Sequence, residues 1–328
     1  MSHGEDGSTK AVITAVVANG LVTIAKFVGF ALSGSSALLA EAIHSLADTA
    51  NQGLLYLGIK RSRRVADVKY HFGYGQERYF WNLVSAVTIF FLGCIYTIMH
   101  ALEQLKHGHE PEMSWIAFGI IGFAFIMEGY SLWVALKEFT RQQKEENMGF
   151  IQYIKETRDP TTLAVLIEDS VAVLGLFFAL TGMGLAAYTG SALFDIGAAI
   201  GIGVLMGLLA FFLAATNKKY LLNVSDGEIN SIALDAWSKD KRVQDVRHIH
   251  SIVLSPEESV VMAELELREE ALFRDMTEEE IQQAIRFMRR LDDVRSSLEK
   301  AVQRKAEEAR HIYIEFGLPE ATEKKSKP

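Results

Sequence analysis

Long apolar stretches alternate with short polar ones over the first two thirds of the chain. Six of these stretches are bounded by charged residues, Gly or Pro, and each is long enough to cross a bilayer as a helix of about 20 residues. We expect helices near residues 11–32, 36–59, 79–102, 113–137, 161–182 and 192–215. The pattern predicts an all-α bundle of six transmembrane helices in residues 1–216.

From residue 217 onward the pattern is typical of a water-soluble α+β unit. It predicts a helix from Asp226 to Lys239, strands over "VQDVRHIHSIVL" and "SVVMAELELR", a long helix after Thr277 and a third strand over "HIYIEF". This α-β-β-α-β order predicts a C-terminal domain over residues 217–318 with a modest core of its own. Residues 319–328 are expected to form a disordered tail.

Charged residues are unevenly distributed between the two predicted domains, and their positions also predict the orientation of the bundle in the membrane. The last 112 residues carry 42 charged side chains, against 32 in the first 216. Eleven Lys and Arg residues lie in the loops 60–78 and 137–159, whereas the connections on the opposite side contain only Lys106. The positive-inside rule therefore predicts that both termini and the C-terminal domain are cytosolic. We expect a multi-pass protein of the cell membrane, with the bacterial inner membrane as the favoured location.

Composition excludes several other classes of protein. A formal net charge of -8 and the lack of a dense basic patch argue against nucleic-acid binding. The single cysteine, Cys94, excludes a disulfide framework and a multi-thiolate metal cage. The apolar stretches make a soluble enzyme fold improbable.

Ionisable residues inside the predicted spans are costly, so each needs a compensating role. His44 and Asp48 lie four residues apart in the second span, which places them on one face of a helix. An imidazole and a carboxylate at this spacing form half of a tetrahedral site, for which zinc is the leading cation. The fifth span adds Glu168 and Asp169, and we expect no Lys or Arg at similar depth to pair with these acids. We expect Asp169 to complete the site, whereas Glu168 is equally suited to bind the metal or to form a hydrogen bond, because adjacent helix positions point about 100° apart.

Other polar residues of the second span have weaker signals. Asn51 and Gln52 follow Asp48 by one turn, where they can orient the ligands or form hydrogen bonds between helices. Glu41 is expected to be an entrance or packing group.

Three further charged residues lie in other spans. Lys26 is expected to snorkel or to pair with an acid, and Glu128 to serve either an ion path or a helix contact. Asp195 is expected near the outer interface as a helix cap.

Histidines of the C-terminal domain suggest a second, weak metal site. His248 and His250 alternate on a predicted strand, and His311 begins the last strand. Together they could form a regulatory cytosolic metal site, although no cysteine or local acidic pattern accompanies them.

Several motifs together carry a resemblance to a known family. They are "SGSSALLAEAIHSLADTANQ", "YHFGYGQERYFW", "DPTTLAVLIEDSVAVLG" and "FDIGAAIGIG". With six spans and an α-β-β-α-β domain, the chain resembles the cation diffusion facilitator family of divalent-metal transporters over nearly its whole length. The second and fifth spans look most similar to the branch that includes the mitochondrial zinc transporters of animals.

The resemblance implies a transport site with two ligands on the second span and two on the fifth. His44 and Asp48 match the first pair and Asp169 matches the second, but Val165 stands at the remaining position and offers no metal-binding atom. Either Glu168 replaces it or the site has three protein ligands. The resemblance also implies a metallochaperone-like cytosolic domain, a homodimer joined partly through that domain, a metal ion as substrate rather than cofactor, and a transporter rather than an enzyme.

These inferences lead to a transport hypothesis. We expect Zn²⁺ efflux by alternating access, coupled to protons at His44 and Asp48, because an imidazole that titrates near pH ~6.5 can exchange a proton for a metal. One alternative keeps the scaffold but exports Mn²⁺, Fe²⁺ or Co²⁺, since carboxylate-rich sites accept harder cations. The other is a membrane-anchored metal sensor or scaffold without vectorial transport, motivated by the highly charged cytosolic unit.

Overall fold

The computed structural model describes residues 19–107, 114–145, 149, 160–306, 308, 309 and 311–316. The predicted helix start over residues 11–18 and the predicted tail over residues 319–328 lie outside this part of the chain. The chain divides into two compact units, one with residues up to 230 together with 250–262, and the other with residues 231–249 and those from 263 onward. The predicted boundary between residues 216 and 217 stays a prediction.

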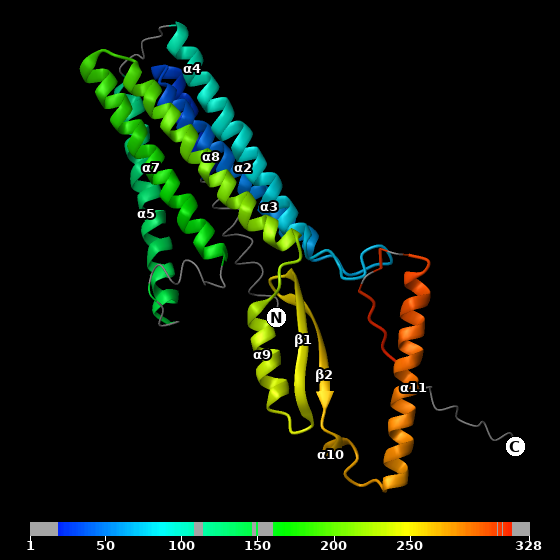
Figure 1. Cartoon of the computed structure of the whole chain (residues 1–328). Coiled ribbons are helices and arrows are strands. Elements are labelled where there is room, and N and C mark those ends of the chain that lie inside the picture. The colour runs from blue at the N-terminus through cyan, green and yellow to red at the C-terminus, as the bar shows by residue number, and fades with distance from the viewer. Residues whose placement is uncertain are drawn as a thin grey trace, which may run out of the picture. The chain divides into compact units, whose positions relative to one another are not determined.

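The first unit is a bundle of long helices (Figure 1). It contains the helix Asn19–Ser33, α2 Ser36–Ser62, α3 Glu77–Thr88, η1 Ile89–Tyr96, α4 Thr97–His107, α5 Trp115–Glu145, α7 Pro160–Thr189 and α8 Leu193–Leu221. In the part of the chain that the structure describes, each of the six predicted spans contains helix. Among the described residues, four helical stretches are long and apolar enough to cross a membrane: Glu77–Lys106, Trp115–Glu145, Val165–Thr189 and Leu193–Leu221. The predicted membrane bundle is confirmed.

Local sequence explains where α2 begins. Gly34, with φ of 63°, turns the chain after the preceding helix, a conformation that glycine adopts without steric cost. Ser35 then caps α2, because its hydroxyl accepts a hydrogen bond from the amide of Leu38 at 3.1 Å. Asp195 at the start of α8 accepts bonds from the Ser35 hydroxyl at 2.5 Å and the Ser36 amide at 2.6 Å. The expected capping role of Asp195 is confirmed, although the helix that it caps is α2.

The third span contains a feature that periodicity did not predict. Between α3 and α4 the helix continues as η1, eight residues of π-helix. Gly93 of this segment lies so close to α8 that a Cβ atom there would be 2.2 Å from Met206 Cε. The widened turn and the missing side chain together let the third span pack closely against α8.

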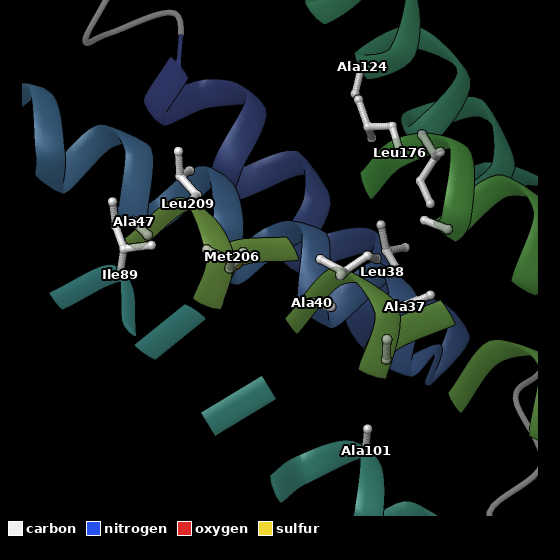
Figure 2. Close-up of a cluster of buried hydrophobic side chains, with 14 of the residues drawn as sticks. Ala37, Leu38, Ala40, Ala47, Ile89, Ala101, Ala124, Leu176, Met206 and Leu209 are labelled. Carbon is white, nitrogen blue, oxygen red and sulfur yellow. The ribbon is translucent and has the colours of Figure 1, made fainter. Parts of the chain in front are cut away.

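The core of the bundle consists mainly of small and aliphatic side chains. Figure 2 shows its buried residues Ala37, Leu38, Ala40 and Ala47 of α2 together with others of η1, α4, α5, α7 and α8. Neighbouring helices pack as α7 on α5 and α8, and α2 on α3, α7 and α8. Small residues at such crossings allow the close approach that stabilises helix pairs in membranes. This packing holds α2 and α7, the two helices of the predicted site, against each other.

The remaining elements follow the predicted order up to the last strand. They are α9 Gly227–Ser238, β1 Val243–Ser255, β2 Glu258–Leu267, α10 Glu269–Leu272 and α11 Glu278–Gln303. β1 and β2 pair in a two-stranded sheet, and their two-residue connection requires them to be antiparallel. Thr277 and Glu280 form a capping box at the start of α11. The C-terminal α+β character is confirmed.

The predicted third strand is wrong. Residues 311–316, "HIYIEF", form no strand in the described part of the chain, where β1 and β2 make the sheet. Alternating apolar residues indicate a surface that suits a sheet, but a strand also needs a neighbouring edge to pair with. Sequence alone does not supply that edge.

Candidate cation site

The predicted ligands lie in the middle of two packed helices. α2 carries His44 and Asp48, and α7 carries Glu168 and Asp169. His44 Nε2 lies 3.3 Å from Asp48 Oδ2, as the spacing of four residues predicts. The first half of the predicted site is therefore assembled.

Acidic residues from three helices line one cavity of about 420 Å³. They are Asp48 of α2, Glu128 of α5, and Glu168 and Asp169 of α7. Asn51 and Gln52 also line it, so both residues predicted to support the ligands lie at the cavity. Four carboxyl groups around one cavity in an apolar bundle attract cations to it.

Hydrogen bonds turn the two acids of α7 in different directions. Asp169 Oδ2 accepts a bond from the Ser131 hydroxyl of α5 at 2.8 Å. Glu168 Oε1 accepts one from Asn51 Nδ2 of α2 at 3.3 Å, and Asn51 Oδ1 accepts one from the Ser85 hydroxyl of α3 at 2.5 Å. The divergence is the one expected for adjacent helix positions. Asn51 thus has the geometry of an orienting residue for Glu168.

His44 stands slightly apart from the acids. Its side chain is 2% exposed, it is not among the residues that line the cavity, and neither ring nitrogen has a hydrogen-bond partner in the described part of the chain. No group of three described His, Cys, Asp or Glu residues is arranged to hold a metal ion. The predicted ligands therefore surround one region without converging on one point, because Glu168 and Asp169 diverge and His44 does not line the cavity that the three acids share.

A second cavity of about 730 Å³ adjoins the same acids. Asn51 and Glu168 line both cavities, and Arg78 and Lys219, at the end of the bundle that the charge pattern assigns to the cytosol, line the larger one. Val165 also lines it. Asn51 and Glu168 thus stand between the two cavities.

Sequence reasoning missed the partner of the buried acids. Lys26 is fully buried, and its Nζ lies 3.0 Å from Glu41 Oε2 and 3.7 Å from Glu128 Oε1. The expectation that Lys26 pairs with an acid is confirmed, whereas treating the acids as remote from any basic residue was wrong. The signal was available in the first span, but a single lysine there does not reveal which helix its side chain faces.

The predicted cytosolic histidine site stays a prediction. His248 has φ of 51°, which interrupts the alternation of β1 on which a shared face with His250 depended. His311 precedes no strand, and its side chain is exposed. Among the described residues no metal-binding group of three includes them.

Fold and cavity together define a polytopic helical membrane protein with a cavity lined by acidic residues between its helices. The sequence model of the cation efflux transmembrane domain matches residues 12–222. The chain belongs to the cation efflux family, whose members are transporters and not enzymes. The resemblance to cation diffusion facilitators, and to the branch of the mitochondrial zinc transporters, is confirmed.

Three relatives illustrate the range of similarity. The human protein named proton-coupled zinc antiporter SLC30A9, mitochondrial, is 39% identical over 219 residues, which are 67% of this chain and 39% of that protein. Metal tolerance protein C4 of Arabidopsis thaliana is 36% identical over 250 residues, 76% of this chain and 55% of that protein. Magnetosome protein MamB of Magnetospira is 27% identical over 222 residues, 67% of this chain and 69% of that protein. The chain thus matches about two fifths of the length of the human relative.

Proposed function

We propose that the protein exports Zn²⁺ across a membrane in exchange for protons, by alternating access to the cavity between α2, α5 and α7. One observation carries the proposal: Asp48, Glu168 and Asp169 from two packed helices line one cavity, and His44 lies in contact with Asp48. Carboxylate oxygens with an imidazole nitrogen suit zinc. The names of the human and plant relatives, a zinc antiporter and a metal tolerance protein, support the same class of substrate.

The two cavities suggest the order of events. A cation enters through the larger cavity, past Asn51 and Glu168, and reaches Asp48 and Asp169. Because a metal ligand must be deprotonated, binding at His44 and Asp48 releases protons, and reprotonation from the opposite side expels the cation. Movement of α2 against α7 closes one entrance and opens the other.

Membrane placement and assembly belong to the same proposal. The loops 60–78 and 137–159, with eleven basic residues, support a cytosolic location of both termini. We assign the protein to the cell membrane of a bacterium, while the human relative is named as mitochondrial. A homodimer is supported by α11, whose Phe287, Val294 and Leu298 are exposed on an amphipathic helix.

The test is flux in sealed proteoliposomes that contain the purified full chain. With an imposed proton gradient and a trapped zinc-sensitive dye, the native protein should move Zn²⁺, and Asp48→Asn, Asp169→Asn and His44→Ala should lower the initial rate at least about 100-fold. Glu145→Gln, at the polar end of α5 with a surface partner, is the matched control and should transport normally. Native rates in the three cavity variants would refute the site.

A second candidate function keeps the transport mechanism but has another divalent metal as substrate. The cavity lining is richer in oxygen than in nitrogen donors, which favours harder cations such as Mn²⁺. Competition of Mn²⁺, Fe²⁺ and Co²⁺ against Zn²⁺ in the same assay separates the candidates. Metal binding without flux in any of them would instead favour a membrane-anchored sensor.

A further inference from the structure

Next to the proposed site lies a group of charged residues that the predicted ligands do not include, centred on the fully buried Lys26. Lys26 Nζ of the helix Asn19–Ser33 contacts Glu41 Oε2 at 3.0 Å and donates to the Ser45 hydroxyl at 2.7 Å, both on α2. It also lies 3.7 Å from Glu128 Oε1 on α5. α7 joins the group at Gly175, where a Cβ atom would be 2.4 Å from Glu41 Oε1.

This group is continuous with the cation cavity. Glu128 and Ser45, two of the three contacts of Lys26, line the cavity together with Asp48 and Asp169. Glu41 is fully buried, whereas the Glu128 side chain is 24% exposed. Lys26 thus contacts one acid that is fully buried, Glu41, and another that lines the cavity, Glu128.

The two contacts of Lys26 with acids also differ in length, and the contact with the more exposed Glu128 is the longer one. The contact to Glu41 is short enough for a charge-assisted hydrogen bond, but the one to Glu128 is too long for one and is an electrostatic contact. Glu128 can therefore leave Lys26 at a smaller cost than Glu41 can. A ligand is also indicated independently, because the buried His44 has no hydrogen-bond partner for either ring nitrogen among the described residues and meets the cavity through Asp48.

We propose that Glu128 is a ligand of the transported divalent cation and that Lys26 is the fixed cation that holds Glu128 when no metal is bound. The inference rests on the proposed transport function. Glu128 of α5 adds a fourth carboxylate to the cavity beside Asp48, Glu168 and Asp169. Metal entry then displaces Lys26 from Glu128, while Glu41 and Ser45 keep the ammonium group in place.

If Lys26 and the metal ion compete for Glu128, removing Glu128 and removing Lys26 should change the metal affinity in opposite directions. Glu128→Gln should weaken binding at least about tenfold, because a ligand is lost. The double substitution Lys26→Met with Glu41→Gln removes the competing charge together with its buried partner, so that Glu41 is not left as an unpaired buried carboxylate. It should tighten binding several-fold. Glu41→Gln alone leaves Lys26 with Glu128 as its one acidic partner and should weaken binding.

The experiment is equilibrium titration of the full-length protein in detergent with Zn²⁺, read by calorimetry, and repeated with Co²⁺ by its absorption spectrum. The decisive variant combines Lys26→Met, Glu41→Gln and Glu128→Gln: its affinity should equal that of Glu128→Gln alone, because Lys26 acts through Glu128. Thermal unfolding of each variant identifies any that fail to fold. If the double variant does not fold, Lys26→Arg, which keeps the charge, is used in its place.

Two results would overturn the inference. One is native affinity in Glu128→Gln, and the other is tighter binding on loss of Lys26 whether or not Glu128 is present. If Asp48→Asn and Asp169→Asn abolish binding while Glu128→Gln does not, the inference alone fails. If those two variants also bind normally, the proposed transport site fails with it.

Discussion

Replacing Asn51 with alanine tests whether the orientation of Glu168 matters for transport while Glu168 itself is kept. Asn51 is 5% exposed and links three helices, since it accepts a hydrogen bond from Ser85 of α3 and donates one to Glu168 of α7. Asn51→Ala removes both bonds but leaves every carboxyl group of the cavity in place. The expected consequence is a poorly oriented Glu168 and not a missing ligand.

The size of the effect follows from the two bonds. Ser85 is 1% exposed, so losing the acceptor of its hydroxyl should lower the free energy of unfolding by about 1–3 kcal/mol. Loss of an orienting group beside a metal ligand should raise the KM for Zn²⁺ about tenfold. Ser85→Ala is the matched comparison: it keeps the bond from Asn51 to Glu168, so KM should rise less.

Zinc flux at a series of concentrations gives KM and maximal rate, and thermal unfolding in detergent gives stability. Asn51→Ala should change both KM and stability, whereas Ser85→Ala should change mainly stability. Equal KM values for Asn51→Ala and the native protein would refute the orienting role. Equal increases in the two variants would place the effect in helix packing instead.

Three further predictions concern the scaffold and are read by thermal unfolding or hydrogen exchange of the full chain. Asp195→Ala removes the acceptor that ties the start of α2 to α8 and should cost about 3 kcal/mol; a native unfolding midpoint would contradict the cap. Gly182→Val should destabilise far more than Gly184→Val, since a Cβ at Gly182 would lie 2.4 Å from a side chain of α8 and one at Gly184 meets nothing within 4 Å. Equal midpoints would exclude close packing there. Thr277→Ala should weaken the first turn of α11 by about 1 kcal/mol and speed its amide exchange, while Thr277→Ser should not; unchanged exchange in the alanine variant would argue against the capping box.

Much of this architecture could be predicted because its causes are local. Apolar length alone identified spans such as α8, and the high cost of charge in lipid singled out Asp48 and Asp169 as candidates for a shared site. A spacing of four residues brought His44 to Asp48, as the structure has it. The acidic start of α11 likewise marked its first turn.

Features that depend on a distant partner could not be predicted in this way. The pairing of Lys26 with Glu41 and Glu128 depends on how the first helix is rotated against α2 and α5. The π-helical turns around Gly93 follow from the approach of α8, and "HIYIEF" lacks a strand edge. In each case the local sequence was compatible with several partners, and tertiary packing chose one.

Anomalous diffraction at the zinc absorption edge, from crystals of the full-length protein grown with Zn²⁺, would test most directly whether α2 and α7 share one cation. The account predicts a peak between the two helices, about 2.0–2.2 Å from oxygens of both Asp48 and Asp169. A strong peak elsewhere, for example beside His248 and His250, with none between Asp48 and Asp169, would contradict it.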